Sequence, residues 1–353
     1  MSTVVIVGAG IVGASVAYHL ARQGMPVTLI ERASAPAAGV TGTSFAWIGA
    51  AGGDWPGGAE DLRGSVLMDY RRLEAEVPGV AVRWTGSLTW GDASVRPGDG
   101  ARLVRGQYWL DRSEVAALEP HLRELPARAV YTPTDGGVDP VRTTGALVDA
   151  ARTLGAQVVL GSGVSALKIV RDRVEGVVSS AGFHPASTVV LAAGTEVGVL
   201  CEPLGVTLPV ATSPAFLIQA AAPPGLVRTI LAGPAFEARE CRGGHLLLVA
   251  PHHAGASGAA LEWLAQHTLA RLRLAFGGAD PLRLLGHGVG RCPMPSGGPV
   301  VGYVTPDKSV YVAVMHSALT LAPTVGRLVA DELVSGAPVA ELRRCRPQRF
   351  SAS

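Results

Sequence analysis

VVIVGAGIVG, at residues Val4–Gly13, is the stretch that decides the fold of this chain. Four β-branched residues lead into Gly-x-Gly-x-x-Gly, and an amphipathic run follows until Gly24 stops it. A second apolar segment then ends in Glu31 and Arg32. This order predicts a strand, a tight turn, a helix and a second strand, which together form the βαβ unit that binds dinucleotides.

Each glycine of this stretch has a physical task. Gly8 permits the turn, Gly10 lets the backbone approach a pyrophosphate, and Gly13 allows the helix to pack closely on the strand. Ile11 and Val12 open the helix, whose N-terminal N–H groups face the phosphates. The motif alone occurs in many folds, but here the strand, the helix and its stop are all in register with it.

Glu31 closes the second strand, where a carboxylate can accept hydrogen bonds from a ribose 2′-OH and repel a 2′-phosphate. Arg32 follows directly at the same end of the strand. We therefore expect this unit to bind an adenine dinucleotide without a 2′-phosphate. The alternative is that the motif is only a structural turn of an α/β protein.

The composition excludes several classes of protein. The net charge of +2 over 353 residues offers no basic field for nucleic acid. The cysteines lack metal-like or paired spacing, so we expect neither a metal site nor a disulfide framework. The first strand begins too early for a signal peptide, and no apolar run is long enough for a membrane span. These patterns predict a cytoplasmic protein; its oligomeric state does not follow from the sequence.

The middle and the end of the chain differ in pattern. Short apolar runs from about residue 200 to 285 predict an antiparallel sheet, which a helix over 259–276 closes. A buried strand that ends in a small-residue turn is predicted again at Thr188–Thr195, and another buried strand at Val310–Val314. This arrangement suggests a second domain inserted into the dinucleotide-binding domain.

The whole chain resembles the FAD-dependent amine oxidoreductases of the D-amino-acid oxidase, glycine oxidase and sarcosine oxidase family. The matching motifs are Gly8–Glu31, Thr43–Trp47, Gly137–Pro140, Val190–Gly194 and the block from Pro293 to Pro323. The resemblance implies an α/β fold: an FAD-binding Rossmann-type, glutathione-reductase-like domain with an inserted antiparallel-sheet α+β substrate domain. The predicted FAD domain comprises residues 1–60, 140–200 and 286–342, and the predicted substrate domain comprises 61–139 and 201–285. Residues 343–353 are predicted to be a loosely ordered basic tail.

The resemblance also implies which residues hold FAD. Val164 lies near the adenine, and Ala193 and Gly194 approach the pyrophosphate. The loop residues Thr43, Ser44, Phe45 and Ala46 can lie beside the cofactor, although a loop packed under the sheet would have the same composition. Ser317, Ala318, Leu319 and Thr320 open the last helix. The N-terminal N–H groups of that helix can stabilise negative charge at the flavin N1 and C2 carbonyl.

Arg291 is the implied clamp for a substrate carboxylate. Family members commonly read Arg-Pro-x-Pro-x-Asp-Gly-x-Pro, whereas this chain reads RCPMPSGGP from Arg291. If Pro-Met-Pro is the anchor, Cys292 takes the position of the arginine, and a shift of one residue turns a strand side chain to the other face. Arg239 and Arg242 are then the alternatives.

The remaining candidates concern the flavin and its reoxidation. Sarcosine oxidases attach FAD through a cysteine near Cys292, but a non-covalent cofactor and a bland buried cysteine remain the expectation. Sarcosine oxidases also place a lysine over the flavin. The corresponding strand of this chain reads Leu246–Leu248, and the lysines of the chain, Lys168 and Lys308, lie outside it. The histidines that can act near the substrate are His245, His252, His253 and His316, and each is also compatible with a purely structural role.

The sequence thus predicts an FAD-dependent enzyme that oxidises a C–N bond of a small amine or a glycine-, sarcosine- or D-amino-acid-like substrate. The substrate amine must be neutral and its α-C–H must point at flavin N5, and the imine product hydrolyses. Oxygen is the expected acceptor, giving hydrogen peroxide. A flavin dehydrogenase or flavoprotein subunit is an alternative, and a non-catalytic interaction protein with a vestigial flavin site is another. A nicotinamide-only dehydrogenase is disfavoured, because the uninterrupted six-strand Rossmann pattern is absent.

Overall fold

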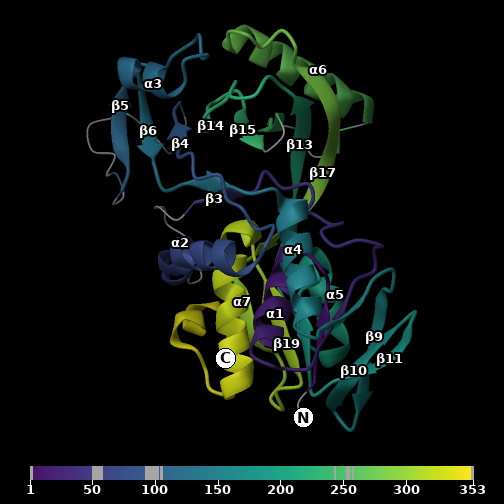
Figure 1. Cartoon of the computed structure of the whole chain (residues 1–353). Coiled ribbons are helices and arrows are strands. Elements are labelled where there is room, and N and C mark those ends of the chain that lie inside the picture. Colours follow the sequence, from purple (N-terminus) through teal and green to yellow (C-terminus); the bar gives the residue numbers. More distant parts are fainter. Residues whose placement is uncertain are drawn as a thin grey trace.

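The computed structural model describes residues 3–49, 59–91, 103, 106–241, 244–251, 255–256 and 258–350. Figure 1 shows a lower part built on the N-terminal strand and an upper part built on a second sheet, with the chain passing between them several times. The sheets, helices and cores described below refer to these residues.

A six-stranded sheet organises the lower part. Its strand order is β18 (Val300–Tyr303), β19 (Val310–Val314), β12 (Thr188–Leu191), β1 (Val4–Val7), β2 (Val27–Ile30) and β8 (Gln157–Val159). All neighbours are parallel except β18 and β19. The residues of β1 are all buried, as expected for a strand that is covered on both faces.

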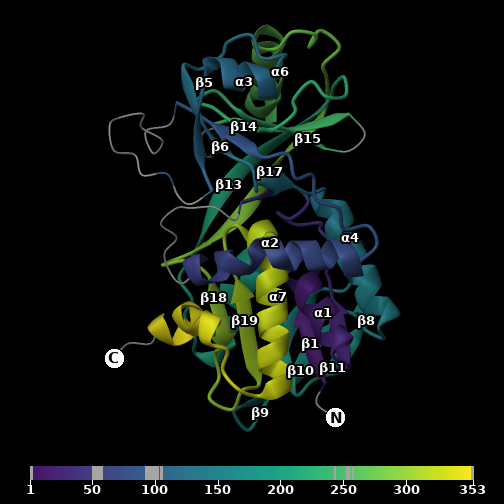
Figure 2. The ribbon, with the colours of Figure 1, turned by 60° about the vertical axis from the view of Figure 1, so that its left-hand side comes forward.

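Helices cover one face of this sheet. They are α1 (Ile11–Arg22), α4 (Pro140–Thr153) and α7 (Ala318–Ser335), and α1 packs between the other two. The helix α2 (Ala59–Glu76) lies across α7, as Figure 2 shows. On the opposite face lies a small antiparallel sheet of β9 (Val164–Val170), β10 (Arg173–Ser179) and β11 (Gly182–Pro185), beside the short helix α5 (Val197–Cys201).

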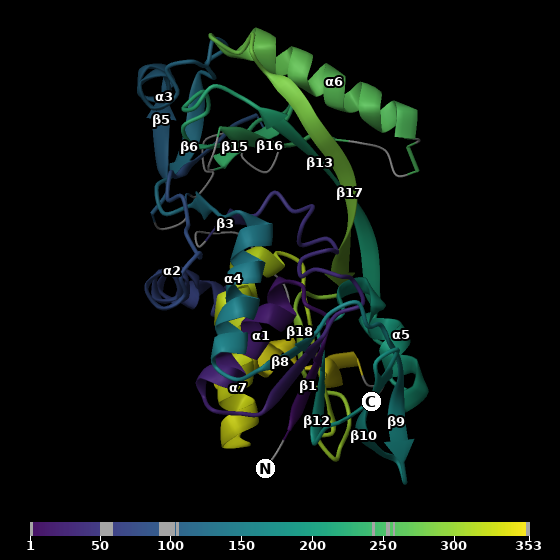
Figure 3. The same ribbon diagram turned by 45° about the vertical axis from the view of Figure 1, so that its right-hand side comes forward.

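An eight-stranded sheet forms the upper part. Its order is β17 (Arg283–Pro295), β13 (Val210–Ala221), β16 (His245–Val249), β15 (Glu237–Cys241), β14 (Ile230–Ala232), β4 (Ser87–Thr89), β6 (Arg128–Thr132) and β5 (Tyr108–Asp111). The helices α3 (Arg112–Leu118) and α6 (Gly258–Ala275) complete this part, and Phe216, Leu246 and Leu269 belong to its core. Figure 3 shows β13 and β17 continuing downward together beside the lower part.

The two parts meet at a short ribbon of β3 (Trp47–Ile48) and β7 (Gly136–Gly137). The predicted α/β class with a parallel dinucleotide-binding sheet and a separate, mostly antiparallel sheet is confirmed. The domain boundaries stay a prediction. The helix α2 lies in the range predicted for the substrate domain, yet Leu62, Val66 and Tyr70 pack into the core of the lower part.

The predicted loosely ordered tail is wrong for residues 343–350. Two 3-10 helices, Ala340–Cys345 and Pro347–Phe350, follow α7. Arg346 donates to the buried carboxylate of Glu332 at 2.9 Å, and Cys345 is fully buried. The basic residues therefore attach this segment to the fold, because they find internal acceptors. Among the described residues, no helix combines the length and apolar character that a membrane span needs.

Candidate functional site

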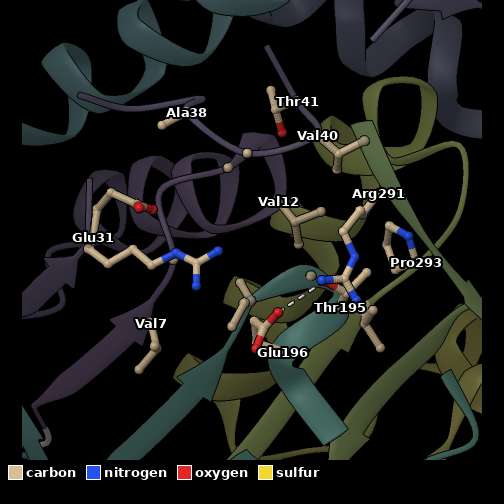
Figure 4. Close-up of a pocket in the computed structure, with 18 of the residues that line it drawn as sticks. Val7, Val12, Glu31, Ala38, Val40, Thr41, Thr195, Glu196, Arg291 and Pro293 are labelled. Carbon is tan, nitrogen blue, oxygen red and sulfur yellow. Dashed lines mark hydrogen bonds between the residues drawn. The ribbon is translucent and has the colours of Figure 1, made fainter. Parts of the chain in front are cut away.

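A cavity of about 610 Å³ opens at the carboxyl ends of β1, β2, β12 and β19 (Figure 4). This volume falls within the range of roughly 300–1,000 Å³ that small-molecule sites occupy. The carboxyl edge of a parallel sheet is also where open α/β folds bind their ligands. The predicted cofactor residues in its wall are Gly8, Gly10, Ile11, Val12, Glu31, Arg32, Thr43, Val164, Ala193, Gly194 and Ala318.

The glycine turn is shaped by close backbone contacts. Gly8 has φ +103°, and a Cβ atom there would lie 2.7 Å from the carbonyl oxygen of Ala192. A Cβ on Gly13 would lie 1.9 Å from the carbonyl oxygen of Gly8, so Gly13 allows the helix to pack on the strand rather than line the cavity. A Cβ on Gly10 would lie 3.2 Å from Thr41 Oγ1. The close contacts at Gly8 and Gly13 fit the turn and the helix packing that the motif predicts, and the approach of a pyrophosphate at Gly10 stays a prediction.

Glu31 lies at one end of the cavity, and Figure 4 shows it on the opposite side from Arg291. Its Oε2 accepts the N–H of Ala9 at 2.7 Å, and its Oε1 accepts the N–H of Ala33 at 2.9 Å. Each carboxylate oxygen has a second lone pair, so the group can still accept from ribose hydroxyls. The two backbone donors fix the orientation of the carboxylate.

The opposite end of the cavity is formed by β17. Val289, Arg291 and Pro293 line it, and Figure 4 shows the guanidinium of Arg291 directed toward Thr195. Because side chains alternate along a strand, Cys292 points to the other face and is not among the lining residues. Burial raises the pKa of the half-buried Cys292 thiol, which keeps it protonated. The structure thus brings Arg291, and not Cys292, to the predicted cofactor site.

The loop after Thr43 turns away from the cavity. Ser44 Oγ accepts the N–H of Ala46, which has φ +53°. Phe45 packs against a cluster on the upper sheet that contains Leu217 and Leu247. Ser44, Phe45 and Ala46 are not among the lining residues, and their predicted contact with the cofactor stays a prediction.

The entrance of α7 was predicted to face the flavin. Ala318 lines the cavity, whereas Ser317 precedes the helix with φ +53° and makes no capping side-chain bond. Leu319 and Thr320 are buried. The carbonyl oxygen of Leu319 accepts the Tyr70 hydroxyl, and Thr320 Oγ1 donates to the carbonyl oxygen of Trp47 at 2.9 Å. These two residues therefore join the helix to its neighbours.

His316 is exposed, and its predicted catalytic and structural roles stay predictions. Its Nδ1 lies 3.1 Å from Ser317 Oγ. Partial burial of the ring and the nearby charge of Arg63 lower the pKa of His316 below its ordinary value. The imidazole is therefore mostly neutral at pH 7 and stands next to Met315, which lines the cavity.

The other candidates lie elsewhere. Arg239 is buried and donates to the carbonyl oxygens of Phe45 and Val138, so it does not point into the cofactor cavity. His245 is exposed at the start of β16. The lysines, Lys168 and Lys308, are exposed and do not line the cavity. Arg242, His252 and His253 lie outside the described residues, so their predicted roles stay predictions.

Several lining residues were not predicted. They include Ala38, Gly39, Val40, Thr41, Gly163, Ser165, Thr195, Glu196, Val289, Pro293 and Met315. Thr195 and Glu196 directly follow the predicted Gly194 turn, so extending that motif by two residues would have found them. No sequence motif marks Thr41. Its Oγ1 accepts the N–H of Ile11 at 3.2 Å, and this contact joins two segments that are separate in the sequence.

Comparisons with known proteins show the family of this chain. The profile of the family described as FAD dependent oxidoreductase (DAO) matches residues 3–332. Glycine oxidase from Pseudomonas aeruginosa is 29% identical over 94% of this chain and 94% of its own length. D-amino acid dehydrogenase from Allorhizobium ampelinum is 28% identical over 59% of this chain and 64% of its own.

Solved structures share the fold at lower identity. The glycine oxidase from Bacillus cereus superposes with a TM-score of 0.79 at 20% identity, covering 97% of both chains. The L-amino acid deaminase from Proteus myxofaciens superposes with a TM-score of 0.85 at 17% identity, covering 99% of this chain and 94% of the other. At these identities, the superpositions establish the common architecture.

Proposed function

The chain belongs to the DAO family of FAD-dependent oxidoreductases, and we propose that it oxidises the C–N bond of a small amino acid or amine to an imine. The proposed substrates are glycine-, sarcosine- or D-amino-acid-like, and the proposed electron acceptor is oxygen. The observation that carries the proposal is Arg291, a cation in the wall of the cofactor cavity that makes no ion pair with any described residue.

The residues of the cavity fit FAD. The tight Gly8 turn, the approach space at Gly10 and the N-terminus of α1 suit a pyrophosphate, and Glu31 suits the adenosine ribose. When bound there, FAD supplies the two-electron oxidation by accepting hydride at its N5 atom. We propose that it is held non-covalently, because Cys292 points away from the cavity and its thiol is protonated.

On the substrate side, Arg291 can hold a carboxylate with two parallel N–H donors. Fixing the carboxylate restricts the orientation of the α-C–H bond, which is the main requirement of this chemistry. Arg291 therefore has a positioning role in this proposal, and glycine-like acids are preferred over simple amines.

The substrate amine must lose a proton before oxidation. His316 is mostly neutral at pH 7 because its pKa is lowered, so its Nε2 can accept that proton. The hydrogen bond between Nδ1 and Ser317 Oγ orients the ring for this role. His316 would then hold the proton taken from the amine. Reduction of oxygen by the two electrons that a bound FAD would carry would consume this proton and give hydrogen peroxide.

A dehydrogenase is the second candidate. The proposed lysine position on β16 is occupied by leucines, and the relatives include a D-amino acid dehydrogenase as well as a glycine oxidase. The two candidates differ in the acceptor, not in the substrate step. Rates with oxygen and with an artificial quinone acceptor, measured on the same reduced enzyme, separate them.

The test is anaerobic mixing of the purified flavoprotein with glycine, sarcosine and D- and L-amino acids, followed by admission of air. Bleaching of the flavin band by an amino acid and its return in air, with hydrogen peroxide, is the expected result. Arg291→Met should raise KM for acids at least tenfold while leaving FAD bound. Arg283→Met, an exposed arginine on the same strand outside the cavity, is the matched control.

Two outcomes would overturn the proposal, and a third would change its electron acceptor. A protein that binds no FAD on reconstitution would favour the non-catalytic alternative. Equal KM values for Arg291→Met and Arg283→Met would remove Arg291 from substrate recognition. Bleaching without recovery in air, but with rapid quinone reduction, would replace the oxidase by the dehydrogenase.

A further inference from the structure

A second cavity, of about 140 Å³, lies where the upper sheet meets the start of α4. It is far larger than the roughly 10–15 Å³ that a single water needs. Its charged lining residues are Arg83, Arg142, Arg239 and Asp139, and Cys241 contributes a thiol. None of its lining residues belongs to the cofactor cavity. In Figure 3, α4 rises toward β3 and the upper sheet at this level.

Arg239 is the largest fully buried side chain among the described residues, with 2% of its surface exposed. Its Nε donates to the carbonyl oxygen of Phe45, its Nη2 to that of Val138 at 2.6 Å, and its Nη1 to Cys241 Sγ at 3.3 Å. A guanidinium has five N–H donors, so two remain without a described acceptor. Gly137 leaves the space for this group, because a Cβ there would lie 2.6 Å from Nη1.

The positive charge of Arg239 has no anionic partner within ion-pair distance among the described residues. Burial raises the pKa of the Cys241 thiol, so the sulfur is neutral. Burial also lowers the pKa of Arg239 itself, which reflects the cost of holding this charge away from water. Two carbonyl oxygens and the ring of Phe45, whose centroid lies 5.5 Å from the guanidinium carbon, offset part of this cost. An anion at the cavity would offset more of it.

The other charges do not cancel that of Arg239. Arg83 pairs with Glu240 at 3.1 Å. Asp139 caps α4 by accepting the N–H of Arg142, and the exposed Arg142 side chain forms no ion pair in the part of the chain that the structure describes. Three guanidinium groups and one carboxylate, that of Asp139, thus line the cavity, and Glu240 pairs with Arg83 from outside the lining.

We propose that this cavity is a binding site for a small oxyanion, which neutralises Arg239 and is held at the rim by Arg142. Arg239 also holds the carbonyl oxygen of Phe45, two residues beyond the cavity-lining Thr43. An anion here therefore strengthens the contact that fixes the loop beside FAD. The site recognises the charge and the acceptor oxygens common to inorganic phosphate and small carboxylates.

The experiment uses the FAD-loaded enzyme, so that the cofactor site is filled. Chloride is replaced by inorganic phosphate, or in a second arm by acetate, at constant ionic strength, and binding is followed by calorimetry and by Tm. Wild-type enzyme should bind one phosphate or acetate per chain saturably, and the arm with the lower Kd identifies the preferred oxyanion. Arg142→Gln should weaken the binding about tenfold or more, as expected for losing one charge-assisted hydrogen bond.

Arg152→Gln is the matched control, because Arg152 is an arginine of the same helix outside this cavity. It should bind the anion as the wild type does. The bound anion should also slow FAD release severalfold in the wild type and in Arg152→Gln, but not in Arg142→Gln at the same concentration. Absence of saturable binding in both arms, or equal affinities for the two variants, overturns the site. Binding with an unchanged rate of FAD release overturns its coupling to the loop.

Discussion

The carboxylate of Glu31 accepts the backbone N–H of Ala9 at 2.7 Å, which ties the end of β2 to the glycine turn after β1. A second bond, from the N–H of Ala33, holds the other carboxylate oxygen at 2.9 Å. The acidic residue thus shapes the turn itself, in addition to any contact with a ribose.

Glu31→Ala should weaken FAD binding about 10- to 100-fold. The change leaves two backbone donors without their acceptor and removes the ribose acceptor, and each charged hydrogen bond contributes about 1.5–3 kcal/mol. Fluorescence titration of the apoprotein with FAD measures the effect. Glu175→Ala, which removes an exposed carboxylate from β10, is the control. Wild-type affinity in Glu31→Ala would contradict the assignment.

Gly8→Ala should be more destabilising than Gly24→Ala. Both glycines have positive φ, +103° and +77°, so both substitutions strain the backbone. Only at Gly8 does the new Cβ meet a backbone atom, at 2.7 Å from Ala192 O, whereas nothing lies within 4 Å of it at Gly24. Urea unfolding should give a loss of about 1 kcal/mol for Gly24→Ala and a larger one for Gly8→Ala, which should also purify with less FAD. Equal losses would show that the close contact is not limiting.

Arg63→Met should shift the acidic limb of kcat/KM to higher pH. Partial burial and the charge of Arg63 lower the pKa of His316. Without Arg63, the imidazole binds a proton more readily, so the neutral base is lost at a higher pH as the pH falls. His316→Gln should remove this limb. A pH profile that is the same in wild type and Arg63→Met would exclude His316 as the proton acceptor.

The buried His19 should make the fold sensitive to acid. Burial lowers its pKa from 6.5 to about 3, so the unfolded chain binds a proton that the folded chain does not between these values. The stabilisation is present above pH 6.5 and is lost progressively as the pH falls toward 3. At 1.36 kcal/mol per pH unit, the loss between pH 7 and pH 5 is about 2 kcal/mol.

His19→Gln tests this contribution. Urea unfolding at pH 7 and at pH 5 measures how far the free energy of unfolding falls between the two pH values. This fall should be smaller in the variant than in the wild type by about 2 kcal/mol. His121→Gln, at an exposed position, is the control and should fall as the wild type does. The same fall in His19→Gln as in the wild type would contradict the prediction.

The sequence by itself determined the dinucleotide-binding unit. Gly8, Gly10 and Glu31 are close along the chain, and the periodicities of strand and helix fix their relative positions before any distant contact forms. The same local logic predicted the buried strands within Thr188–Thr195 and at Val310–Val314, because runs of apolar residues are typical of a strand that is covered on both faces. In the structure the first of these strands ends at Leu191.

Only the tertiary structure decided which side chains meet at the site. The pairing of β17 with β13, with Arg291 opposite Pro214 and Cys292 opposite Ser213, sets which of the two residues faces the cavity. A register cannot be read from RCPMPSGGP, because a slip of one residue reverses every side chain. Arg239 was an alternative for binding the substrate carboxylate. In the structure it donates instead to the carbonyl oxygens of Phe45 and Val138, which lie far from it in the sequence. Contacts between distant segments depend on how the whole chain packs, and local patterns carry no record of that packing.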